Sequence, residues 1–148
     1  MARGPQSRAD VQVFAEITAI GQLARNRIER ALPRGMSYAQ FMTLVHLARD
    51  GAATGPAVLA RAFQLTKGAM TNTLHRLEAQ GYIAVEGHEG DGRRKRVAIT
   101  DKGLAAHREA LAATRPATEA LRKRFSNDDF AAALPFLGDL RSWLDANR

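Results

Sequence analysis

The sequence predicts a mainly α-helical fold (α+β) with one β-hairpin, and three observations support this prediction. Apolar residues recur at helical spacing over most of the 148 residues. Two short alternating segments, 82–86 and 94–99, are joined by a glycine-rich stretch, as in a β-hairpin. A serine, threonine or proline stands where each helix after the first is expected to begin.

The first two helices are predicted from their periodicity and their ends. One covers Asp10–Leu32 and is stopped by Pro33 and Gly35. Its apolar stripe consists of Val11, Phe14, Ile17, Ala24, Ile28 and Ala31. The next runs from Ser37 to Gly51, because Ser37 and Gln40 have the spacing of a capping box.

Two shorter helices and the hairpin follow. One helix is expected from Gly55–Pro56 to about Phe63, and the other from its cap Thr66 to Gln80–Gly81. Ile83 and Val85 of the first strand, with Val97 and Ile99 of the second, would face one side. The hairpin is too small to be stable alone, so that side is expected to pack on the helices.

The last third of the chain is expected to form two helices. Thr100 caps one that runs to about Phe125, and Ser126–Asp129 begins the other. Pro116 is expected to kink or split the first helix, and Pro135 makes the first turn of the second uncertain.

This order of elements is that of a winged helix-turn-helix, a fold that reads duplex DNA. The formal net charge of +7 and the pI of about 10.7 favour a polyanionic partner, with nucleic acid ahead of a membrane surface. No Asp or Glu occurs in the 27 residues from Gly51 to Leu77, although the chain has 15 acids. A recognition helix needs such a stretch, because phosphates repel carboxylates.

Two groups of residues are the candidate DNA contacts. On the predicted recognition helix they are Thr66, Lys67, Thr71, Asn72, His75 and Arg76. Asparagine suits the two adjacent groups of adenine, and arginine suits guanine. On the hairpin they are Arg93, Arg94 and Lys95. Strand alternation places Arg93 and Lys95 on one side and Arg94 and Arg96 on the other, so either pair could enter a minor groove or hold phosphates.

These features resemble the MarR-type transcriptional regulators. The resemblance is carried by SYAQFMTLVHLARDG, LARAFQLTKGAMTNTLHRLEAQGYI and DGRRKRVAITDKG. It implies one domain over 1–148, with a winged helix region at 37–103 between dimerisation helices at 10–36 and 104–148. It also implies a cytoplasmic homodimer that binds an inverted-repeat operator, usually as a repressor, and is often released by a small ligand. Arg93 would be the wing-tip arginine, oriented by an ion pair with Asp91.

The residues that suggest a ligand pocket and those that suggest a dimer each have an alternative interpretation. Tyr38, Met42 and His46 recur on one face of the second helix and could line a pocket for an aromatic or amphipathic acid. Alternatively, Tyr38 and Met42 belong to the core and His46 is partly exposed. The apolar stripe of the first helix and the face 130–143 exceed what a small winged domain needs. They would be exchanged between two monomers, or else pack within one.

Other classes of function find little support. The chain has no cysteine, no close pair among its four histidines and no catalytic motif, so we expect no metal, no cofactor and no enzyme activity. No apolar run is long enough to span a membrane, and the polar N-terminus does not resemble a secretory signal. An RNA-binding module is disfavoured, because only 6% of residues are aromatic. The remaining alternative is an architectural or anti-silencing DNA-binding protein that needs no ligand.

Overall fold

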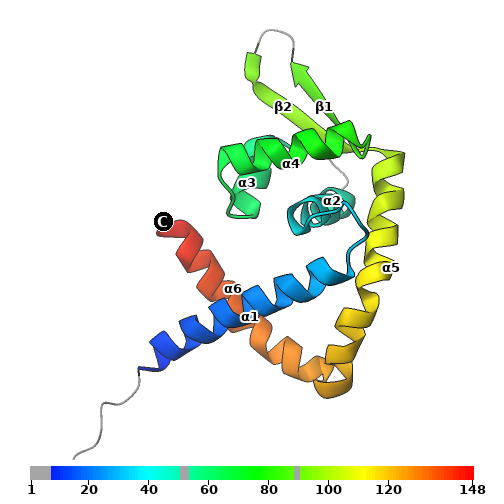
Figure 1. Ribbon diagram of the computed structural model, residues 1–148. Coiled ribbons are helices and arrows are strands. Elements are labelled where there is room, and N and C mark those ends of the chain that lie inside the picture. The colour runs from blue at the N-terminus through cyan, green and yellow to red at the C-terminus, as the bar shows by residue number, and fades with distance from the viewer. Residues whose placement is uncertain (1–7, 51–53, 89–90) are drawn as a thin grey trace, which may run out of the picture. The chain divides into compact units, whose positions relative to one another are not determined.

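The computed structural model describes residues 8–50, 54–88 and 91–148 (Figure 1), with the side chains of Asp50, His88 and Asp91–Arg94 outside the description. In this part of the chain there are six helices and one two-stranded antiparallel sheet, so the predicted fold class is confirmed. The elements are α1 (Ala9–Ala31), α2 (Tyr38–Asp50), α3 (Pro56–Ala62), α4 (Lys67–Ala79), β1 (Ile83–His88), β2 (Asp91–Ile99), α5 (Asp101–Arg124) and α6 (Asn127–Ala146).

The chain divides into two compact units, Met1–Thr114 and Arg115–Arg148. The first unit holds α1 to α4, the hairpin and the first part of α5. The second holds the remainder of α5 and α6. None of the helices within the described residues is both long and apolar enough to cross a membrane.

The predicted helix starts in the first unit are confirmed by their hydrogen bonds. The Ser37 N–H donates to Oε1 of Gln40 at 2.8 Å, and the Gln40 N–H donates to Oγ of Ser37 at 3.2 Å. Pro56 lies in the first turn of α3, where its missing N–H is harmless. The Ala69 N–H donates to Oγ1 of Thr66, at 3.1 Å, at the start of α4.

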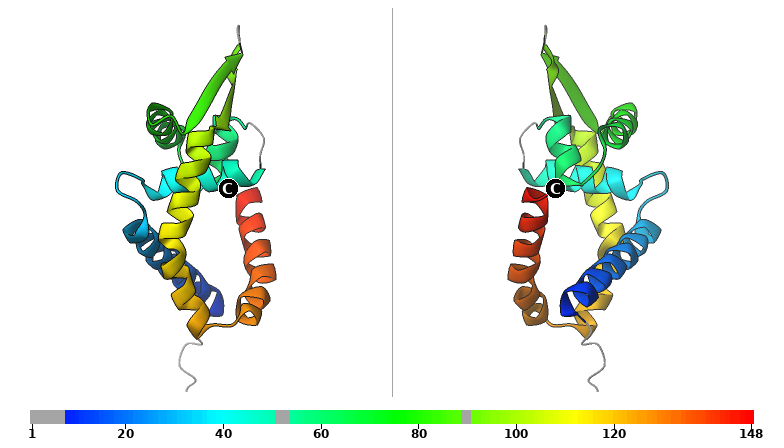
Figure 2. Two further views of the ribbon diagram at one scale, coloured as in Figure 1. Left: turned by 90° about the vertical axis from the view of Figure 1, so that its right-hand side faces the viewer. Right: turned by 90° about the vertical axis from the view of Figure 1, so that its left-hand side faces the viewer.

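The hairpin packs on the helices through the side that the sequence predicts. Ile83 pairs with Ile99 and Val85 with Val97, and both Ile83 and Val97 are buried. They join the core formed by α2, α3 and α4, whose buried side chains are Leu44, Leu47, Leu59, Ala60, Met70, Leu74 and Leu77. The strands extend beyond the predicted segments, and the hairpin projects away from the helices of its unit (Figure 2).

Thr100 and Gly103 join the base of the hairpin to α5. The Thr100 hydroxyl accepts a hydrogen bond from the Gly103 N–H at 3.0 Å and donates one to the carbonyl of Gly81 at 2.6 Å. Gly103 is buried, and a Cβ at this position would lie only 2.0 Å from the carbonyl oxygen of Tyr82. This close approach holds the start of α5 against the segment between α4 and β1.

The second unit contains both helical prolines, and it contradicts the split expected as one possible effect of Pro116. Ser126 and Asp129 form the predicted capping box at the start of α6. However, α5 is not split at Pro116, and α6 continues through Pro135. Each proline removes one backbone donor, and both residues are exposed. The hydrogen bonds of the flanking turns therefore suffice to continue both helices.

Candidate nucleic-acid interface

Helix α4 is amphipathic, and its polar side is the predicted recognition surface. Met70, Thr73, Leu74 and Leu77 are buried against the core. The six residues predicted as DNA contacts on this helix and its cap are all exposed: Thr66, Lys67, Thr71, Asn72, His75 and Arg76. The helix thus presents a polar surface on a rigid apolar support, as a recognition helix requires.

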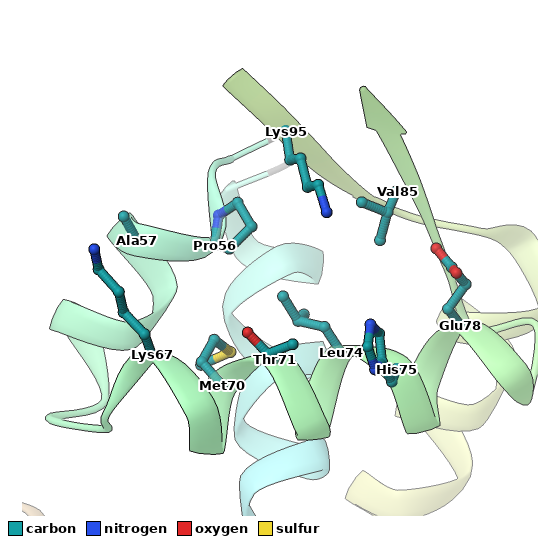
Figure 3. Close-up of a pocket in the computed structure, with 10 residues that line it drawn as sticks. All are labelled: Pro56, Ala57, Lys67, Met70, Thr71, Leu74, His75, Glu78, Val85 and Lys95. Atoms are coloured by element: carbon teal, nitrogen blue, oxygen red, sulfur yellow. The ribbon is translucent and has the colours of Figure 1, made fainter. Parts of the chain in front are cut away.

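A groove of about 320 Å³ lies between this helix, α3 and the hairpin (Figure 3). We call it the α4–wing groove, where the wing is the hairpin formed by β1 and β2. Its lining residues are Pro56, Ala57, Lys67, Met70, Thr71, Leu74, His75, Glu78, Val85 and Lys95. The floor is apolar, and the polar groups stand along the helix and on β2.

The lysines on the two sides of the groove come from different elements. Lys67 is the first residue of α4, and Lys95 projects from β2 toward that helix (Figure 3). Lys95 lies two residues before the buried Val97, so both side chains are on the same face of the strand. Both lysines are exposed and line one groove, an arrangement that suits a phosphodiester backbone.

The candidate DNA contacts within α4 divide into two groups, according to whether they line the groove. Lys67, Thr71 and His75 line the groove, at spacings that place them on one side of the helix. Asn72 and Arg76 are four positions apart and do not line the groove. We therefore assign the first group to the side that faces the hairpin, and the second group to the outward surface of the helix.

The predicted contacts at the tip of the hairpin lie outside the described side chains. Asp91, Arg93 and Arg94 belong to β2 by their backbone. Their contact with DNA and the ion pair between Asp91 and Arg93 stay predictions. The side of the strand that faces the groove is established by the buried Val97 and by Lys95, which lines the groove.

The sequence did not predict the contributions of α3 and of Glu78 to the groove. Pro56 and Ala57 come from the start of α3, and Val85 from β1. Glu78 is the first acid after the acid-free stretch and follows Thr71 and His75 at helical spacing. This spacing was the signal that could have placed Glu78 on the same side of α4.

The residues predicted to line a ligand pocket are partly buried and lie away from the groove. The Arg25 guanidinium of α1 lies over the Tyr38 ring, 5.4 Å from its centroid. The rings of His46 and Phe63 meet edge to face, with centroids 5.7 Å apart. Met42 is also partly buried. These positions leave the ligand pocket a prediction.

Comparisons with known proteins agree with this fold. Residues 34–94 match the sequence model of the MarR family. The transcriptional regulator BldR from Sulfolobus solfataricus is 22% identical, with a TM-score of 0.81 over 94% of this chain and 99% of that one. A mutant MarR from E. coli, crystallised with operator DNA, is 22% identical, with a TM-score of 0.75 over 93% and 99%.

A third structure has a bound small molecule. It is a MarR-family protein from Mycobacterium tuberculosis in complex with salicylic acid, 24% identical, with a TM-score of 0.64 over 93% of this chain and 97% of that one. A search of curated proteins finds no match. At these identities the structural comparisons establish a common fold, in agreement with the resemblance noted from the sequence.

Proposed function

We propose that the chain is a homodimeric, sequence-specific DNA-binding regulator of the MarR type, because residues 34–94 match the model of the MarR family and its fold is shared with regulators of known structure. It acts in the cytoplasm, represses from an inverted-repeat operator, and is released by a small aromatic or amphipathic acid. The α4–wing groove is the observation that carries this proposal.

DNA binding is supported by the way that this groove and the outward surface of α4 complement each other. Lys67 and Lys95 are positioned to hold a phosphodiester backbone from two sides. Asn72 and Arg76 then lie on the adjacent surface of α4, where they can reach base edges in the major groove. Phosphate contacts position the protein, and base contacts supply the specificity.

Dimerisation is supported by the apolar side chains that neither unit buries. No residue of α1 or α6 is buried. In α1, Ile20 is 59% exposed and Leu23 is 68% exposed; in α6, Leu134 is 66% exposed and Trp143 is 62% exposed. Exposed apolar surface on this scale is typical of an interface, and a second copy of the chain would cover it.

A small ligand is supported by the salicylic acid complex of the M. tuberculosis protein. In this chain Tyr38, Met42 and His46 are our candidates for its site, at one face of α2 near Arg25. Arg25 pairs with Glu29 at 3.1 Å, so a ligand carboxylate would compete with Glu29 for this arginine while the ligand ring packs beside Tyr38. Titration of salicylate against the protein–DNA complex tests the proposal, and release that is unchanged in Tyr38→Ala and His46→Ala would exclude this site.

Selection of bound sequences from random duplex DNA tests the main proposal. We expect an inverted repeat with half-sites about 10 base pairs apart, because a dimer places its two recognition helices about one helical turn apart. Affinity that varies little with sequence and falls steeply with salt would instead support the architectural alternative. No binding to any duplex would refute both.

The oligomeric state can be tested by the molar mass in solution. Leu23→Glu places a charge in the exposed apolar surface of α1 and is expected to weaken or abolish the dimer. Gln22→Glu introduces the same charge at the neighbouring exposed position and serves as the matched control. A wild-type protein that is monomeric at micromolar concentration would contradict the proposal.

A further inference from the structure

The α4–wing groove has opposite charges at its two ends. Lys67 stands at one end, beside Ala57, and Glu78 stands at the other, beside His75 and across from Val85 (Figure 3). Glu78 follows Lys67 by eleven positions, which corresponds to about 16 Å along the helix axis. Lys95 enters the groove from the hairpin side.

The stability of α4 does not explain the presence of Glu78. The residue lies in the last turn of this helix, where a negative charge opposes the helix dipole. Its side chain is exposed, and within the described part of the chain no ion pair includes it. It also follows a stretch of 27 residues without any acid, and among the described residues that line the groove no other is acidic.

We propose that Glu78 excludes the DNA backbone from the hairpin-base end of the α4–wing groove and thereby sets the register in which the phosphates are held. This inference rests on the proposed DNA-binding function. Lys67 attracts a phosphodiester at one end of the groove and Lys95 attracts it from the hairpin side, whereas Glu78 repels it from the other end. Glu78 is therefore a specificity-determining residue that acts through repulsion.

The range of the electrostatic interaction fits this role. At physiological ionic strength the Debye length is about 8 Å, so Glu78 acts on the phosphates nearest to it and not on one held near Lys67, about 16 Å away. Phosphates follow each other every ~3.4 Å of helix axis along one strand. A slip of the backbone along the groove would bring a phosphate within range of the carboxylate. The repulsion therefore acts mainly on shifted registers and on non-specific complexes.

The test compares Glu78→Gln with Glu86→Gln on a mixed-sequence duplex and on sites selected by the wild-type protein. Both variants remove one negative charge, and Glu86 lies on β1 opposite Arg96 and outside the groove. We expect Glu78→Gln to bind the mixed-sequence duplex about threefold to tenfold more tightly, with a smaller gain on selected sites. Glu86→Gln should change either affinity less than about twofold.

The salt dependence of the affinity provides a second readout. A variant that binds more tightly only because its fold is more stable would not lose its advantage in the same way as salt is added. The advantage of Glu78→Gln should shrink between about 50 mM and 200 mM KCl, since salt screens the repulsion that the substitution removes. If wild type binds DNA but Glu78→Gln binds the mixed-sequence duplex equally or more weakly, the inference is overturned and the proposed function stands. If wild type binds no duplex, both are overturned.

Discussion

Replacing Gly103 by alanine should strongly destabilise the protein, although the residue lies within a helix. A Cβ here would be 2.0 Å from the carbonyl oxygen of Tyr82 and 2.8 Å from Cγ1 of Ile99. Ordinary contact begins at 3.4 Å, so the start of α5 and the Tyr82 carbonyl must separate by about 1.4 Å. The same carbonyl accepts a hydrogen bond from the Thr100 N–H at 3.0 Å, so the separation also strains this contact.

The size of the loss in stability follows from two destabilising contributions and one stabilising contribution. Overpacking costs about 1–3 kcal/mol. Weakening the Thr100 hydrogen bonds to Tyr82 and Gly81 adds about 1 kcal/mol for each one lost. The higher helix propensity of alanine returns up to about 1 kcal/mol. A net loss of about 2–4 kcal/mol is expected, which lowers the melting temperature by roughly 5–15 °C in a protein of this size.

Thermal unfolding followed by circular dichroism measures this loss in the absence of DNA. Gly68→Ala is the matched control, because a Cβ at this exposed position of α4 meets nothing within 4 Å. Its melting temperature should stay the same or rise slightly. An unchanged melting temperature for Gly103→Ala would refute the reasoning, because the start of α5 would then have room for a side chain.

Four further predictions concern the turn between α3 and α4, the pH dependence of stability and two of the DNA contacts. Gln64 has a φ of +54° between α3 and α4, so Gln64→Val should lower the free energy of unfolding by about 1–2 kcal/mol and Gln64→Gly should not lower it, as urea titration can check. Burial, together with the charge of Arg108, lowers the pKa of His107. The unfolded chain therefore takes up the proton first, and stability falls as pH decreases below about 6.5; urea unfolding of His107→Gln at several pH values should show a smaller fall. Asn72→Ala should cost about 1–3 kcal/mol on a selected operator and little on random DNA, with equal losses on both excluding a base contact. Arg93→Ala should weaken binding to all sequences and reduce the salt slope by about 1.

Features that depend on neighbouring residues could be predicted from the sequence. The capping boxes at Ser37 and Ser126 and the cap at Thr66 each involve side chains three residues apart or fewer. The alternation of Ile83 and Val85 likewise indicated which side of the hairpin is buried. These signals act within a few residues, so the chain specifies them before any tertiary packing is known.

Features that depend on distant parts of the chain were either not predicted from the sequence or predicted wrongly. Gly103 was noted only as part of a motif, because its contact with Tyr82 spans a whole hairpin. The split expected at Pro116 is absent, since the turns on both sides preserve the helix. The place of Glu78 in the groove does not follow from its position after the acid-free stretch, because the groove is assembled from α3, α4 and both strands.

The position of Lys95 shows how the core determines the charge of the candidate site. For the basic run taken alone, strand alternation gives two sides, and an apolar residue of the same strand is needed to say which of them faces α4. Val97 decides this, because it is fully buried and is held by backbone hydrogen bonds to Thr54 at 2.7 and 3.1 Å. Lys95, two residues earlier, must then face the same way. The groove therefore gains its second lysine from the packing of an apolar residue, and a one-residue slip of β2 would place Arg96 there and expose Val97.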